Sequence, residues 1–342
     1  MKKLKSQLCL VIGLLLVFSF CTQADEKPFR LGIIGLDTSH AVNFTKYLNN
    51  PENKTGCRVV AGYPGGSPDI PSSIDRVPEY TKKLRDEYGL EIVSSIEELC
   101  QKVDGILLES VDGRPHLEQV KPVFAAKKPV YIDKPMGGSL TDVLEIFDLA
   151  RQNNIPCWTS SSLRFTPSII GMRNNDKVGQ VLGCHAFSPC GLEPHHPDFY
   201  WYGIHGVEIL FTIMGPGCVS VSRKHAEDAD IAVGVWEDGR IASFRGTRKG
   251  RHDYGALVFG TKGNAQTGGF DGYGHMLDKV ALFFKTGAIP VSPEETINLF
   301  AFMTAADESK KLNGAAVSIA SVMEKAKKEL AQRRACKANC KK

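Results

Sequence analysis

Short apolar runs alternate with amphipathic stretches through the first half of this chain, and this alternation limits the fold more than any other feature. The runs predict strands at 29–35, 58–62, 105–109, 129–132 and 156–159. The stretches between them predict helices at 39–48, 78–88, 96–101, 115–125 and 141–152. Alternating strands and helices favour a doubly wound parallel sheet of the dinucleotide-binding, Rossmann type.

The second half has a different pattern of predicted strands and helices. Consecutive strands are predicted at 180–187, 217–224, 231–235, 240–245 and 256–259, with helices at 205–213, 275–284, 294–312 and 319–335. This order favours an α+β domain with a mostly antiparallel open sheet. A chain of 342 residues is long enough for two cores, so we expect one domain at 25–160 and a second at 161–342.

The N-terminus has the pattern of an export signal. Three lysines among the first five residues precede an apolar run at 8–20, and Ala24 stands before a charged stretch. We therefore expect residues 1–24 to be removed and the protein to be exported, with the periplasm as its compartment. A lipid anchor at Cys21 is the alternative, and we expect no integral membrane contact in the processed chain.

The charge balance excludes one class of partner. The chain has 42 basic and 38 acidic residues, and removing the three lysines of the signal leaves a net charge of +1. This value gives no reason to expect a nucleic-acid partner. The cysteines outside the signal show no Cys-x-x-Cys pair; Cys336 and Cys340 lie one helical turn apart, and disulfides are permitted but not identified.

The first strand is followed by an altered phosphate-binding loop. A dinucleotide fingerprint reads Gly-x-Gly-x-x-Gly, whereas residues 35–40 read GLDTSH and keep only Gly35. Asp37 occupies the second glycine position, where its carboxylate would repel a pyrophosphate unless it turns away to cap the helix. Thr38 and Ser39 still offer hydroxyls and amides. The second predicted strand ends without the usual ribose-binding acid.

A resemblance covers most of the chain, from about residue 29 to 319. It is carried by the segment 105–153, where Asp133-Lys134-Pro135 is a version of a Glu-Lys-Pro hallmark, by His116 at the start of a helix, and by the segment 287–309. Arg164-Phe165 followed by Pro167 adds to it. The sequence resembles the Gfo/Idh/MocA family of sugar oxidoreductases. The resemblance implies a carbohydrate substrate and NAD or NADP, held by Gly35, Asp37, Thr38, Ser39, His40, Glu109, His116, Asp133, Lys134 and Pro135.

Two residues are candidates for catalysis. Lys134 follows a predicted parallel strand at the edge where ligands bind, so it can exchange a proton with a hydroxyl while hydride leaves the same carbon. The alternative to this catalytic role is a structural one, in which Lys134 forms an ion pair with Asp133 or Glu109. His205 matches the family's catalytic histidine, but Trp201 stands where the family has an aspartate four residues earlier. Without that aspartate, three roles remain for His205: it assists catalysis, it only binds the substrate, or it is a buried residue that packs in the core.

A polar and aromatic stretch at 195–202 precedes His205 and suits a sugar-binding loop. Metal binding by its histidines with Glu208 is the alternative, but their spacing matches no metal motif and we predict no metal site. The clusters at 251–254 and 273–275 are candidates to join the same pocket. The predicted substrate-binding residues are Arg164, His195, His196, Trp201, Tyr202 and His205.

Three functions remain open from the sequence. The first is an NAD(P)-dependent oxidoreductase acting on a sugar or polyol. The second is an NAD-dependent glycosidase that recycles a tightly held cofactor. The third is a non-redox carbohydrate-binding protein, lyase or isomerase, which the altered glycine loop and export in an unfolded state favour. A homo-oligomer built on the open sheet is a further expectation.

Overall fold

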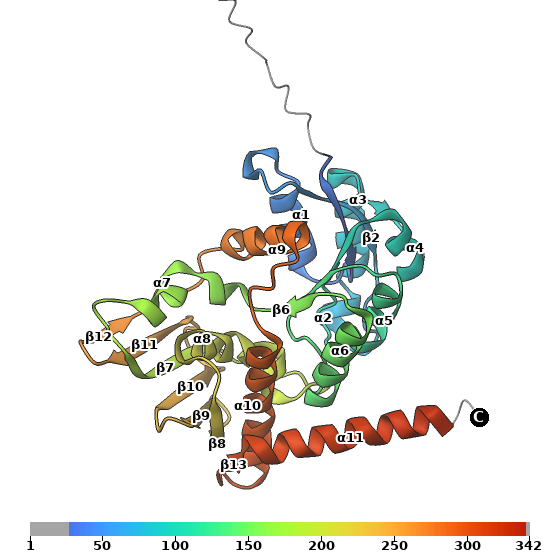
Figure 1. The fold of residues 1–342 in the computed structure, drawn as a ribbon. Helices are drawn as coiled ribbons and strands as arrows, with labels where there is room; N and C mark the ends of the chain where they lie inside the picture. The colour runs from blue at the N-terminus through green and yellow to red at the C-terminus, as the bar shows by residue number, and fades with distance from the viewer. Residues whose placement is uncertain (1–26, 340–342) are drawn as a thin grey trace, which may run out of the picture.

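The structure is a computed structural model that describes residues 27–339, and these residues contain two β-sheets with their helices (Figure 1). The first sheet is entirely parallel and has the order β3-β2-β1-β4-β5-β6. Its strands are β1 (Phe29–Ile34), β2 (Cys57–Tyr63), β3 (Glu91–Ile92), β4 (Gly105–Leu108), β5 (Val130–Ile132) and β6 (Cys157–Thr159). The order reverses between β1 and β4, which is the point where ligands bind in such sheets.

The helices of this half follow the predicted alternation. They are α1 (Ser39–Leu48), α2 (Pro71–Ile74), α3 (Val77–Tyr88), α4 (Ile96–Lys102), α5 (His116–Ala125) and α6 (Leu140–Asn153). Ser95 caps α4, because its side chain accepts a hydrogen bond from the Glu98 amide. The residues of β4 are all buried, as expected for a central parallel strand covered by helices on both faces.

The second sheet is mostly antiparallel and has the order β12-β11-β7-β10-β9-β8-β13. Its strands are β7 (Val181–Pro189), β8 (Cys218–His225), β9 (Ala229–Trp236), β10 (Ile241–Thr247), β11 (Gly255–Gly260), β12 (Asn264–Gln266) and β13 (Val317–Ser318). The helices are α7 (Pro167–Ile170), α8 (Ile204–Met214), α9 (Gly274–Thr286), α10 (Pro293–Lys311) and α11 (Ile319–Asn339). The predicted fold class is therefore confirmed. In the second sheet, as far as the described residues form it, only β7 and β10 pair in parallel.

Two helices from the end of the chain pack against the first half. In Figure 1, α9 lies beside α1, and the Tyr47 hydroxyl of α1 donates a hydrogen bond of 2.8 Å to Asp278 of α9. Apolar side chains of α9 belong to the same buried cluster as the side chains of β1 and α1. Helix α11 contacts α6, where Arg333 forms an ion pair of 2.7 Å with Asp142.

Some predictions concern residues that the structure does not describe. The expected signal at 1–24, Cys21 and Cys340 all lie outside residues 27–339. Of the cysteines that are described, each has a free thiol, and six of the seven are buried. Within the same residues, none of the helices combines the length and the apolar composition needed to cross a membrane.

Gly35 ends β1 in a conformation that a side chain would strain. Its φ is +92°, and an added Cβ would lie 2.4 Å from the Ser110 backbone nitrogen. We predict that Gly35→Ala lowers the free energy of unfolding by about 2–4 kcal/mol, because strain and overlap add. Urea denaturation measures this change. Gly171→Ala is the control, since its φ is ordinary and nothing lies within 4 Å of the added atom; equal effects of the two changes would contradict the prediction.

Candidate active site

A cavity of about 440 Å³ lies where the carboxyl ends of the first sheet face the second half of the chain. Residues from both halves line it, so neither half forms it alone. Its lining residues are Thr38, Ser39, His40, Ser72, Arg76, Val111, Lys134, Ser162, Leu163, Trp201, Tyr202, His205, Tyr254, Phe270 and Tyr273. The two predicted catalytic residues are both among them.

Lys134 follows directly after β5, and its cis peptide bond with Pro135 belongs to the turn that leaves the strand. The residue is only 7% exposed. Among residues 27–339, its amino group has no hydrogen bond or ion pair, so the alternative of a pairing with Asp133 or Glu109 does not hold. Asp133 instead pairs with His40, at 2.7 Å between Oδ2 and Nδ1. Lys134 therefore lines the cavity without an ion pair of its own among the described residues.

His205 faces the same cavity from the first turn of α8. A π-helical turn, Phe199–Gly203, precedes it and carries Trp201 and Tyr202 into the lining. His205 Nδ1 lies 2.8 Å from the Ser161 hydroxyl. Burial, with the charge of Lys134 adding to it, holds the pKa of His205 well below its usual value. The imidazole is therefore neutral at physiological pH, and Nε2 is left to meet a substrate.

Several lining residues were not predicted. Ser72 and Arg76 come from the connection between β2 and α3, and Phe270 comes from a loop of the second half. Tyr254 and Tyr273 belong to the two clusters that the sequence proposed as candidates, and both line the cavity. The sequence did not identify Ser72 and Arg76 as lining residues, because the sequence of a long polar loop does not specify which part of the fold the loop contacts.

Asp37 turns away from the cavity, but it does not cap α1. Thr38 caps the helix by accepting a hydrogen bond from the His40 amide. The Asp37 carboxylate is fully buried and accepts hydrogen bonds from the Ser73 hydroxyl at 2.5 Å and from the Val111 amide at 3.1 Å. Burial outweighs these bonds and raises the pKa of Asp37.

Glu109 is a second buried carboxyl, at the end of β4. Among residues 27–339 neither of its oxygens has a hydrogen-bond partner, and the residue is 0% exposed. Burial first, and then the nearby charges of Asp133 and Asp37, raise the pKa of Glu109 well above its usual value. This raised pKa disfavours the charged form of Glu109, which would otherwise compete for Lys134.

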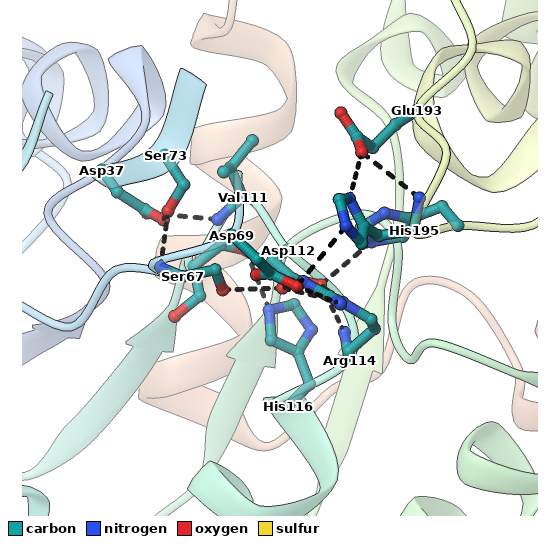
Figure 2. A network of polar contacts seen from close by, with 12 residues as sticks. Asp37, Ser67, Asp69, Ser73, Val111, Asp112, Arg114, His116, Glu193 and His195 are labelled. Atoms are coloured by element: carbon teal, nitrogen blue, oxygen red, sulfur yellow. Dashed lines mark hydrogen bonds and ion pairs between the residues drawn. The ribbon is translucent and has the colours of Figure 1, made fainter. Parts of the chain in front are cut away.

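The connection after β2 folds over the switch point between β1 and β4, and we call residues 64–76 the covering segment. Figure 2 shows its contacts with the loops after β1 and β4. The Ser67 hydroxyl donates to Asp112 at 2.6 Å, and the Ser73 hydroxyl donates to Asp37. Asp69 accepts two hydrogen bonds of 2.8 Å from the guanidinium of Arg114. The covering segment is thus fixed at three separate points.

The second half of the chain also holds this network. His196 Nε2 lies 3.0 Å from Asp112, and His195 Nε2 lies 3.7 Å from Asp69 (Figure 2 labels His195). Burial acts to raise the pKa of Asp112, but the bonds from His196, Arg114 and Ser67 prevail and hold it well below its usual value. Asp112 is therefore ionised and joins three segments of the chain.

The residues on the β2 side of the switch point determine whether a nicotinamide dinucleotide can bind there. The adenosine part of such a ligand lies on the β2 side of the switch point, over the loops after β1 and β2. Here the covering segment occupies that side, and Asp37 and Ser73 are both 0% exposed beneath it. Tyr63 ends β2 where an acid would bind the ribose. The residues present do not fit the adenosine part in this closed form, although the cavity at Thr38, Ser39 and Lys134 remains open.

The other predicted residues lie outside the cavity. Gly35, His116 and Pro135 are buried near it, and the ring of His116 contacts the Ser110 carbonyl at 2.9 Å. Arg164 is buried in ion pairs with Glu208 and with Glu295, the latter at 2.7 Å. Both ion pairs hold the Arg164 guanidinium inside the protein, and Arg164 does not line the cavity. Among residues 27–339, no group of three or more His, Cys, Asp or Glu side chains is arranged to hold a metal ion.

Comparison with known proteins agrees with this sheet order. Residues 29–161 match the profile described as the oxidoreductase family with an NAD-binding Rossmann fold, GFO_IDH_MocA. The likeness to this family covers residues 29–161, which is less than half of the chain. An uncharacterized oxidoreductase of Bacillus subtilis, YrbE, is 25% identical over 54% of this chain and 62% of its own length. An uncharacterized oxidoreductase of Streptococcus pneumoniae is 26% identical, over 36% of this chain and 35% of its own length. The matches thus span less than two thirds of either relative.

Solved structures share the fold over a longer stretch. A probable dehydrogenase from Thermotoga maritima has a TM-score of 0.70 at 19% identity, over 86% of this chain and 100% of its own. A scyllo-inositol dehydrogenase from Lactobacillus casei, with bound NAD(H) and scyllo-inositol, has a TM-score of 0.69 at 16% identity over 86% of this chain and 100% of its own. At these identities the likeness concerns the fold, including the second sheet.

The raised pKa of Glu109 predicts a pH effect on stability. Its pKa is higher in the folded than in the unfolded chain, so the wild type loses stability as the pH rises above about 4.5. Glu109→Gln removes this loss. We predict that the variant gains stability relative to the wild type by up to about 1.4 kcal/mol for each pH unit until the folded pKa is reached.

Urea denaturation of both proteins between pH 5 and pH 9 measures this gain. Glu87→Gln is the matched control, because Glu87 is exposed on α3 and has no ion pair among the described residues. A difference between Glu109→Gln and the wild type that does not change with pH would show that Glu109 is not a buried acid.

Proposed function

We propose that this chain is an enzyme that acts on a sugar or polyol by proton transfer at Lys134, with His205 assisting. One observation carries the proposal. The unpaired Lys134 amine and the neutral His205 ring face one cavity, and polar and aromatic side chains surround them. Rings such as Trp201 and Tyr254 suit the apolar face of a sugar, while hydroxyl groups suit the polar lining.

The chemistry follows from the partners of each group. Lys134 has a free amino group with which to exchange a proton with a substrate hydroxyl or with a carbon next to a carbonyl group. The Leu163 amide donates to the Ser161 oxygen, so the Ser161 hydroxyl proton can point at His205 Nδ1. This favours a hydrogen on Nε2, which then donates to the substrate oxygen.

The redox form of this proposal is an NAD(P)-dependent oxidoreductase. The family of residues 29–161 supports it, as does the neighbour that binds NAD(H) and scyllo-inositol. A nicotinamide would supply hydride transfer at the carbon whose hydroxyl meets Lys134. This form requires the covering segment to move, and an NAD-dependent glycosidase would require the same movement.

The second form is a lyase, isomerase or carbohydrate-binding protein without cofactor. The closed adenosine side favours it, since Asp37 is buried beneath the covering segment. Export in an unfolded state, which we propose from the first 24 residues, adds support because such a chain cannot carry a cofactor across a membrane. In a lyase or isomerase Lys134 and His205 keep the same roles, whereas in a carbohydrate-binding protein they only bind the sugar.

One experiment separates the two forms. The purified protein, without its first 24 residues, is denatured, any released nucleotide is identified, and NAD and NADP are then titrated with the melting temperature as readout. The closed crevice predicts no released nucleotide and no shift at millimolar cofactor. Bound nucleotide, or a saturable shift, would establish the redox form instead.

A second experiment tests the role of Lys134 in either form. A panel of sugars and polyols is screened by melting temperature, and turnover is followed for those that stabilise the protein. Lys134→Ala is expected to lower kcat by about 100-fold or more. Lys177→Ala is the control, since Lys177 is exposed and lies outside the cavity. Full turnover by Lys134→Ala would remove Lys134 from the mechanism.

A further inference from the structure

Three positive features converge on one end of the cavity. The N-terminus of α1 presents Thr38, Ser39 and His40 to it, Arg76 enters from the covering segment, and Lys134 enters from β5. Helix α1 has ten residues and no acidic residue in its first turn, so its dipole is not neutralised there. Such a terminus attracts an anion.

Lys134 is the independent observation that points to a ligand. It is 7% exposed, lines this cavity and has no partner among residues 27–339. Its amino group borders the cavity, where a polar or anionic group of a ligand can meet it. The guanidinium of Arg76 is likewise without an ion pair in the described part of the chain.

The charge of Asp133 acts on Lys134, but among residues 27–339 none of the nearby carboxylates forms an ion pair with it. Asp133 pairs with His40 at 2.7 Å. Asp37 accepts from Ser73 and Val111 beneath the covering segment. Glu109 is buried and its pKa is raised well above the usual value. The end of the cavity near α1 therefore carries net positive charge.

In the family fold, the N-terminus of the first helix receives the pyrophosphate of a dinucleotide. The covering segment closes the adenosine side here, so a complete dinucleotide does not fit. An anion at α1 must then belong to a smaller ligand. A cavity of about 440 Å³ is of the size that takes one small molecule.

We propose that the substrate of this site is an anionic sugar, whose carboxylate or phosphate lies between the N-terminus of α1 and Arg76, with its reacting carbon beside Lys134. The inference rests on the proposed function, because it places the same substrate against Lys134 and His205. Arg76 is a specificity residue in this arrangement. Its planar guanidinium suits carboxylate and phosphate oxygens.

The test is isothermal titration of the protein with a panel of hexuronates, hexose phosphates and the matching neutral hexoses, with NAD in a parallel arm. At least one anionic sugar is expected to bind about tenfold or more tightly than its neutral counterpart. Arg76→Gln is expected to remove most of that preference, and added salt to weaken it. Comparing the uronate and phosphate arms identifies the anion.

Lys83→Gln is the matched control, because Lys83 lies on α3 beyond Arg76 and does not line the cavity. The proposal is wrong if no anionic sugar binds in the millimolar range, if neutral hexoses bind equally well, or if Arg76→Gln leaves the preference intact. NAD that binds more tightly than any sugar and loses affinity in Arg76→Gln would also overturn it. Loss of turnover in Lys134→Ala tests the proposed function separately, since the Arg76 preference is measured by binding alone.

Discussion

Asp112 is the charge on which the shape of this site depends. It joins Ser67 of the covering segment, Arg114 of its own loop and His196 of the second half of the chain. Removing Arg114 would leave this buried carboxylate without its guanidinium partner, and a buried charge that loses its partner typically costs about 3–5 kcal/mol. Opening the crevice therefore means disturbing contacts that also hold the two halves together. A movement that opens the crevice therefore also changes how the two halves of the chain pack against each other.

The fold followed from the sequence because strands and helices of ordinary length leave periodic patterns. The alternation of strands and helices in the first half and the strands β7 to β11 of the second sheet were predicted. Strands β3, β12 and β13 were missed because each has only two or three residues, too few to alternate. The parallel pairing of β7 with β10 was also not predicted, since pairing between distant strands leaves no local pattern.

The candidate site was predicted only in part. Lys134 and His205 follow from a motif and from positions at element ends, and both face the cavity. Asp37 could be recognised as unusual, but its partner Ser73 could not, because a loop of Gly, Pro and Ser does not specify its path. The environment of Arg164 was equally hidden: Glu208 and Glu295 reach it from helices far along the chain.

The position of α9 has a consequence for how the chain folds. Met276, Leu277 and Phe283 of α9 complete the apolar cluster that also contains Leu31 and Phe44. The first sheet is therefore partly uncovered until the ribosome, or the translocation machinery, has released the chain beyond residue 286. A helix from the end of the chain must return across the second half to cover it. The domain nearest the N-terminus thus finishes folding late, and a truncation before α9 would leave its core exposed.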